Sequence, residues 1–98
     1  MTSDKDPTII DLLERLRLQA RGWFIRDYWE ADLCAIGISS RKQPTRLVYV
    51  STFNKSANNY DYEFEQLSSS TSVDYDSVID EQSVGFEDLV CRMEAFLN

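Results

Sequence analysis

The sequence predicts an α+β domain of two layers, with an N-terminal and a C-terminal helix packed on one face of a three- to four-stranded antiparallel sheet. Apolar residues recur at helical spacing near both ends of the 98-residue chain, alternate with polar residues in its middle, and are separated by short polar stretches. Two apolar helix stripes and one apolar sheet face bury each other best as two layers. The expected order is helix, three strands, an optional fourth strand, and helix, in a single domain over 1–98 with a disordered tail over 1–6.

The first helix is expected from about Pro7 to Arg21. Asp6 can cap its free N–H groups, proline suits the first helical position, and Gly22 suits the end of a helix. Asp11 and Arg15 have the spacing of a favourable i,i+4 pair. The apolar stripe that would face the sheet consists of Ile9, Leu12, Leu13, Leu16 and Ala20.

The middle of the chain contains the strand patterns. Residues 31–39 are apolar on both faces, which is typical of a central strand covered on one side and partly on the other. Residues 45–53 are rich in β-branched and aromatic side chains, and residues 60–67 alternate strictly. Residues 73–78 are the optional fourth strand, at an edge, where charged outward positions discourage aggregation. Residues 23–28 either begin a short strand or form a connecting turn.

The closing helix is expected from about Gly85 to Leu97. Glu87 and Asp88 stand in its first turn, where the helix dipole favours negative charge. Its apolar face consists of Phe86, Leu89, Val90, Met93, Phe96 and Leu97.

The composition argues against several classes of protein. No stretch approaches the roughly 20 apolar residues of a transmembrane helix, and the first residues lack a secretory signal, which predicts a cytoplasmic protein. The chain has no histidine, and Cys34 and Cys91 match no zinc-binding spacing, so neither a metal nor a cofactor is expected. The two cysteines are expected as small buried side chains, with a single disulfide as the alternative.

Charge is distributed unevenly along the chain. The net charge is −7, and nine bases against seven acids up to Asn59 give way to ten acids and one base from Tyr60 onward. Such an acidic half repels nucleic acid and suits a basic protein partner. Solubility alone is the alternative explanation.

The sequence shows no catalytic arrangement and predicts a protein that is not an enzyme. There is no histidine to act as a base, and three glycines cannot form a phosphate-binding loop. Glu30 and Asp32 would share a strand face, but nothing in the sequence marks either as buried. A calcium loop starting at Asp74 fails, because Ile79 stands where glycine is needed and Gly85 where glutamate is needed.

The candidate partner-binding residues are mostly carboxylates. Asp61, Glu63 and Glu65 alternate along the strictly patterned strand, and Arg46 is the base expected opposite them. The remaining candidates are Asp74, Asp76 and, as an aromatic anchor, Trp29. The alternative interpretations are a solvated strand face for the acids and core packing for the aromatic cluster Trp23, Phe24, Tyr28 and Trp29.

Several features recur in an order that is shared with a known family: a Leu-rich first helix with Trp23 after it, the Trp29-Glu30 pair, Ile36 and Ile38 at a strand end, and Leu89 and Phe96 in the last helix. In these features the layout of the chain resembles the immunity protein 53 family of polymorphic-toxin systems. Where the family has a turn similar to Asp-Asn-Pro-Gly-Trp, this chain has Arg41-Lys42-Gln43-Pro44-Thr45. The resemblance implies a small cytoplasmic antitoxin that binds and neutralises a cognate toxin without catalysis.

The chain is also similar to type III secretion chaperones, which are small, acidic, helix-first α+β proteins that usually dimerise. That resemblance implies a homodimer formed through an apolar helix or sheet face. The favoured hypothesis is a non-catalytic protein-binding module of the immunity type, with the chaperone-like homodimer as the alternative. A domain with no identifiable activity is the third.

Overall fold

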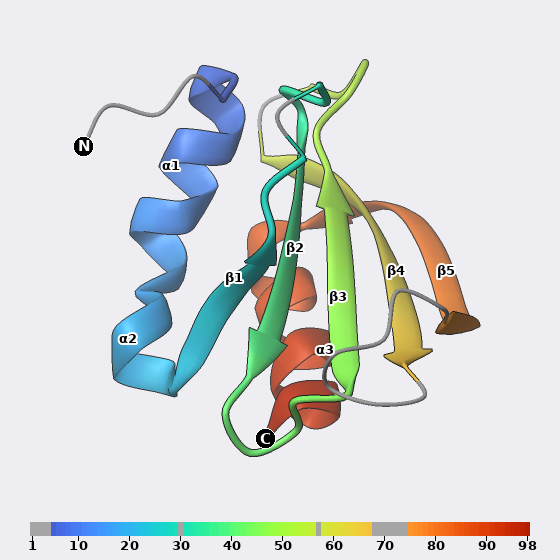
Figure 1. Ribbon diagram of the computed structural model, residues 1–98. Coiled ribbons are helices and arrows are strands. Elements are labelled where there is room, and N and C mark those ends of the chain that lie inside the picture. Colours follow the sequence, from blue (N-terminus) through green and yellow to red (C-terminus); the bar gives the residue numbers. More distant parts are fainter. Residues whose placement is uncertain (1–4, 30, 57, 68–74) are drawn as a thin grey trace.

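The computed structural model describes residues 5–29, 31–56, 58–67 and 75–98, and of residues 75–82 it describes the backbone. Within this part of the chain, helices precede and follow a five-stranded antiparallel sheet (Figure 1). In chain order the elements are α1 (Pro7–Leu16), α2 (Leu18–Arg21), β1 (Trp23–Asp27), β2 (Ala35–Ser40), β3 (Arg46–Ser51), β4 (Asn59–Leu67), β5 (Tyr75–Gly85) and α3 (Phe86–Leu97).

The sheet is a meander in which each strand pairs with the next along the chain, so β1 and β5 lie at its edges. The predicted α+β architecture is confirmed, but with five strands. Residues 23–27 form a full edge strand paired with β2. The last strand runs to Gly85 because it pairs along the whole of β4. Residues 73 and 74, predicted as its start, lie outside the described residues.

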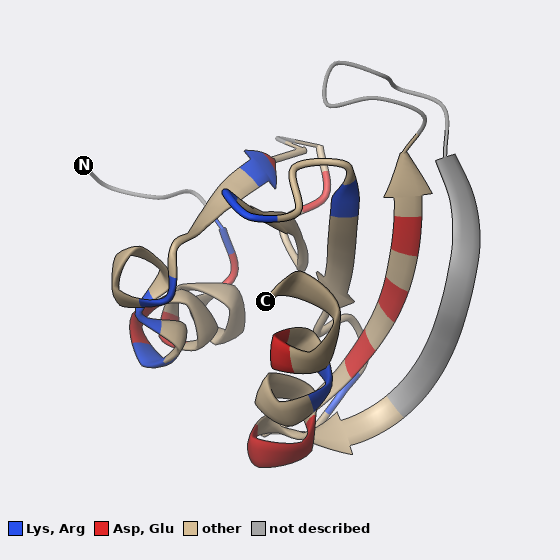
Figure 2. Ribbon diagram, turned by 90° about the horizontal axis from the view of Figure 1, so that it is seen from below, with Lys and Arg blue, Asp and Glu red and all other residues tan. Residues whose placement is uncertain are grey.

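Both helical segments lie on the same side of the curved sheet (Figure 2). The buried residues that fill the space between the layers include members of α1, α3 and the strands β1 to β4, and all are at most 5% exposed. The apolar stripes predicted for the two helices supply six of them. These core residues are Ile9, Leu12, Leu16, Trp23, Ile36, Ile38, Val48, Val50, Tyr60, Tyr62, Phe64, Leu89, Met93 and Leu97.

The first helix is shorter than predicted. Asp6 caps it and its i,i+4 pair forms, but Arg17 adopts a left-handed conformation with φ 51° and ends α1. The short α2 then turns in a new direction, so Leu18 rather than Ala20 packs against the core. Arg17 is neither glycine nor proline, so composition gives no signal for the break. The side chain of Arg21 compensates by donating to the freed carbonyl of Leu16 at 2.7 Å.

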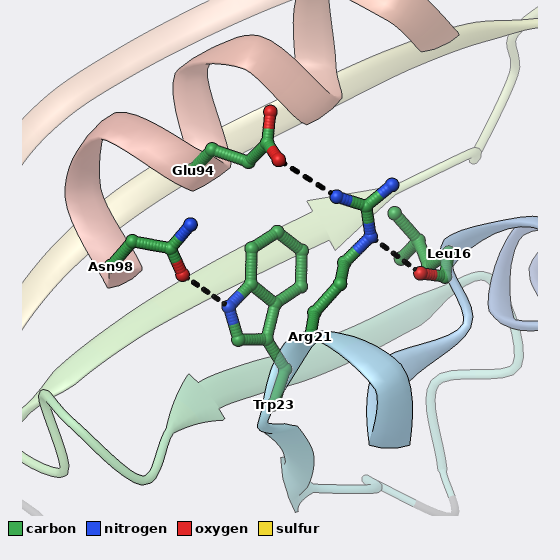
Figure 3. Close-up of polar contacts among 5 residues, drawn as sticks. All are labelled: Leu16, Arg21, Trp23, Glu94 and Asn98. Atoms are coloured by element: carbon green, nitrogen blue, oxygen red, sulfur yellow. Dashed lines mark hydrogen bonds and ion pairs between the residues drawn. The ribbon is translucent and has the colours of Figure 1, made fainter.

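Trp23 joins the two ends of the fold (Figure 3). Its indole is 1% exposed, and its Nε1 donates to Oδ1 of Asn98, just after α3, at 3.1 Å. Beside it, Arg21 binds Glu94 of α3 at 2.9 Å. These contacts tie α2 and β1 to the last turn of α3, which holds the helix layer against the first edge of the sheet.

Both cysteines are free thiols. Cys34 is half-buried, but Cys91 is exposed on α3, so the prediction that both are buried is wrong for Cys91. Helix periodicity explains the difference, because Cys91 falls between the buried positions Leu89 and Met93. None of the helices described here is long and apolar enough to cross a membrane.

Candidate functional site

The candidate site lies on the outer face of the sheet, opposite the helices. Alternate residues of β3 and β4 point there, and the register pairs Ser51 with Asp61, Tyr49 with Glu63, and Leu47 with Glu65. Acidic residues recur at intervals along β4 (Figure 2). No helix of the described residues covers this face, which leaves its side chains to pack against one another and against the loop after β1.

The three predicted strip residues share the outer face but differ in environment. Asp61 is neutralised by Lys55 at 3.1 Å and accepts a hydrogen bond from the backbone N–H of Ser83. Glu63 is half-buried and joins no ion pair among the described residues. Glu65 is only 5% exposed, so it does not present a surface carboxylate as predicted.

Arg46 does not serve as the base for this strip. It pairs in register with Gln66, so its side chain lies on the helix side of the sheet. There it donates to the backbone oxygen of Phe96 at 2.9 Å and lies over the Phe96 ring. Lys55, from the loop before β4, takes its place as the base beside Asp61.

Among the described residues of this face, Glu65 has the most perturbed environment. Its pKa is raised from 4.5 to about 7, mainly by burial and to a smaller extent by the neighbouring carboxylates of Glu63 and Asp27. Glu65 forms no hydrogen bond or ion pair with another described residue that would stabilise its charge. At neutral pH this side chain is therefore divided between its protonated and ionised forms.

Trp29 lies across the outer face and is not part of the main core. Its ring centroid is 5.4 Å from that of Tyr49, and its Cη2 atom lies above Gly37 of β2. The backbone of Trp29 is left-handed, with φ 47°, a conformation that bulky residues rarely adopt. Such strain persists only where surrounding contacts hold it.

Lys5 provides those contacts. Lys5 is 3% exposed, and its ammonium donates to the backbone oxygens of Trp29 at 2.8 Å and Asp32 at 2.6 Å. It also lies 4.4 Å from the centroid of the Tyr28 ring. The predicted disordered tail therefore does not include residues 5 and 6, because Lys5 is buried under this loop and Asp6 caps α1.

Gly37 of β2 lies directly under the Trp29 ring and leaves room for it. A Cβ at this position would lie 2.9 Å from Cη2 of Trp29 and 3.1 Å from both Cβ of Asp27 and Cδ1 of Leu47. All six residues of β2 are buried, so this strand is covered more completely than predicted, since only partial cover was expected on its second side. A glycine inside a β-branched strand is itself a sign of such a close approach.

We expect Gly37→Ala to displace the Trp29 ring and to lower the free energy of unfolding by about 1–3 kcal/mol, the usual range for an overpacked site. Urea unfolding measures the stability, and the Trp29 indole resonance in NMR spectra reports the ring. The Trp29→Ala/Gly37→Ala double variant is the control, because removing the ring relieves the closest contact. Purely additive effects of the two substitutions would contradict this account.

The aromatic pair stands in a negative field. Burial raises the pKa of Tyr49 above its usual value, a hydrogen bond with Ser51 opposes this, and the carboxylates of Asp32, Glu63 and Asp61 raise it further. We call Asp27, Trp29, Tyr49, Glu63 and Glu65 together the acidic aromatic face. It combines a rigid aromatic surface with carboxylates that lack cationic partners among the described residues.

Of the other predicted residues, the structure describes the side chain of Asp32 alone. Asp76 pairs in register with Gln66, which alternates with the strip residues along β4. Asp74 and Glu30 lie outside the described residues. Asp32 is exposed and accepts a hydrogen bond from the backbone N–H of Cys34.

Sequence reasoning missed Asp27, Tyr49 and Gly37. The glycine could have been found from its position in a strand, but Asp27 and Tyr49 become neighbours of the strip only through the strand register.

A separate hollow of about 240 Å³ lies at the N-terminal end of α1. It is lined mostly by hydroxyl and amide side chains, and Thr8 and Thr52 hydrogen-bond each other there at 2.7 Å. Its volume is below the roughly 300 Å³ at which small-molecule sites usually begin. None of the predicted site residues lines it.

Among the described residues, no three Cys, Asp or Glu side chains are arranged to hold a metal ion. Searches with the whole chain found no matching protein-family model, curated protein or solved structure.

Proposed function

We propose that this protein is a non-catalytic protein-binding module that uses the acidic aromatic face to bind a basic protein partner. The supporting observation is the Trp29–Tyr49 pair beside Glu63, on a sheet face that no described helix covers. Tryptophan and tyrosine are the side chains that most often anchor protein interfaces. Carboxylates that lack a cationic partner among the described residues add complementarity to a basic surface.

The resemblance to the immunity protein 53 family gives this proposal its concrete form. In that form the protein is a cytoplasmic antitoxin, and its carboxylates pair with the Lys and Arg residues that a basic toxin uses on its substrate. Access to the toxin's site would then be blocked without any reaction on the antitoxin. Neither a cofactor nor catalysis is part of the proposal.

The test compares two charge reversals. Glu63→Lys changes the proposed surface, and Glu14→Lys makes the same change at an exposed position of α1. We expect the tagged wild-type protein to retain a basic protein from its native lysate, at low salt more than at moderate salt. Glu63→Lys should weaken binding of that purified protein at least tenfold, and Glu14→Lys should leave it within twofold.

The captured protein must also be tested for function. It should be toxic when expressed alone, and the wild-type module should suppress the toxicity while Glu63→Lys does not. Equal weakening by both charge reversals would show that net charge, and not this face, governs binding. A stable dimer mass with no specific partner would favour the chaperone-like alternative.

A further inference from the structure

The acidic aromatic face contains an unusual carboxylate beneath its surface groups. Glu65 is 5% exposed, sits opposite the buried Leu47, and has no hydrogen-bonding or cationic partner among the described residues. Burying an ionised carboxylate without a partner is energetically unfavourable. A cationic group from a binding partner would supply the interaction that Glu65 lacks among the described residues.

The groups around Glu65 show what kind of cation fits. Trp29 and Tyr49 lie 5.4 Å apart by ring centroids and are tilted by 54°, which offers an aromatic surface next to the acids. Glu63 and Asp27 are close enough to Glu65 to raise its pKa by their charge. The planar guanidinium of arginine binds carboxylates through two parallel hydrogen bonds and also stacks on aromatic rings. The ammonium of lysine binds a carboxylate as a point charge, without this two-bond geometry.

We propose that the acidic aromatic face is a receptor for an arginine side chain of the protein partner, which stacks on Trp29 and Tyr49 and pairs with Glu63 and Asp27 above Glu65. The inference rests on the proposed function and identifies the partner's contact residue. Cation–π contact with tryptophan and charge-assisted hydrogen bonds both favour arginine at this position.

Binding at this site is linked to a proton. An incoming guanidinium favours the ionised form of Glu65, so affinity increases as the pH rises through the pKa of about 7. Among the side chains that the structure describes, the titratable groups near Glu65 are Glu63 on its own strand and Asp27 on β1. On β5 the register places Ser77 opposite Glu65 and Asp80 opposite Glu63, while β3 contributes Leu47 and Tyr49.

The chain is well suited to detecting this linkage. It contains no histidine, so no other side chain has an ordinary pKa between 6 and 7. The ionised fraction of Glu65 rises from about one tenth at pH 6 to about nine tenths at pH 8. Affinity for an arginine probe should therefore increase by about five- to tenfold over this interval.

The experiment uses a blocked hexa-arginine peptide as the probe and hexa-lysine as its comparison. The protein has two tryptophans, so its two indole N–H resonances report Trp29 and the buried Trp23 separately. We expect hexa-arginine to shift the Trp29 resonance and leave Trp23 unchanged, and to bind at least threefold more tightly than hexa-lysine. Glu65→Gln should reduce the change in affinity between pH 6 and pH 8 to less than twofold.

Each contrary result has a defined meaning. An unshifted Trp29 resonance, equal binding of the two peptides, or a full pH dependence in Glu65→Gln would overturn the arginine site. Failure of the proposed function is distinguishable, because capture of the protein partner could be lost while the peptide still binds at Trp29. Conversely, partner binding that depends on Glu63 but not on pH would retain the proposed function and reject this inference.

Discussion

Glu65→Gln should stabilise the protein at pH 8 by about 2–3 kcal/mol, equivalent to an increase of roughly 10 °C in Tm for a domain of this size. The pKa of Glu65 is raised from 4.5 to about 7 in the folded state, first by burial and then by Glu63 and Asp27. The folded protein therefore keeps a proton on this group over a range in which the unfolded chain has lost it. Glutamine has the same shape without the charge.

The sign of the pH dependence follows directly. The contribution of Glu65 to stability is complete below pH 4.5 and is lost as the pH rises through about 7. The stabilisation by Glu65→Gln should therefore be small at pH 5 and reach its full size at pH 8. Urea unfolding at several pH values measures both.

The matched control is Glu14→Gln, which removes an equal charge from an exposed position on α1. This control separates the effect of removing a buried charge from the effect of reducing the net charge of −7. A stabilisation by Glu14→Gln as large as that by Glu65→Gln would assign the effect to net charge. No stabilisation by Glu65→Gln at pH 8 would show that the Glu65 carboxylate is adequately solvated in the folded protein.

The alternation along β4 predicted which side chains share a face, but not how deeply each is buried. Asp61, Glu63 and Glu65 do point to the same side, as period-two spacing requires. Their different environments come from residues distant in sequence. Lys55 neutralises the first, and the burial of Glu65 depends on packing that only the strand register creates.

The loop that carries Trp29 was also beyond the reach of local patterns. Its strained backbone depends on a hydrogen bond from Lys5, 24 residues earlier in the chain. A lysine near the N-terminus resembles a solvated tail in the sequence, because lysine is seldom buried. The break at Arg17 likewise has no local signal, because the residues around it favour a continuous helix.

The core, in contrast, was predictable from period alone. Apart from Ala20, the stripes of both terminal helices and the apolar positions of the central strands face one another in the structure as predicted. Trp23 belongs to this core, although the sequence left its role open within an aromatic cluster. Its burial is decided by its place opposite Ser40 on the helix side of β1.

Trp23→Ala should be the most damaging single substitution considered, with a loss of about 3–5 kcal/mol in the free energy of unfolding. The ring is 1% exposed, so its removal leaves a large cavity between the sheet and α3. The variant also leaves Oδ1 of Asn98 without the indole donor that lies 3.1 Å away. Small domains have only about 5–15 kcal/mol of stability, so Trp23→Ala will be partly unfolded in moderate urea.

Trp23→Phe separates packing from hydrogen bonding. It keeps most of the apolar volume and removes the N–H donor, so we expect a loss of about 1–2 kcal/mol. Combined with Asn98→Ala, it should cost less than the sum of the single substitutions, because the two groups share one interaction. Strict additivity in thermal or urea unfolding would mean that the hydrogen bond contributes nothing to stability.

The same variant tests whether stability and binding are separable in this fold. Trp23 packs on the helix side of the sheet and Trp29 lies on the outer side, so the two rings report opposite faces. Well below its Tm, Trp23→Phe should bind hexa-arginine within twofold of wild type. Gly37→Ala, with a similar loss of stability, should weaken binding because it displaces Trp29. If both variants weakened binding equally, the peptide would be sensing global stability, and the outer face could not be treated as an independent site.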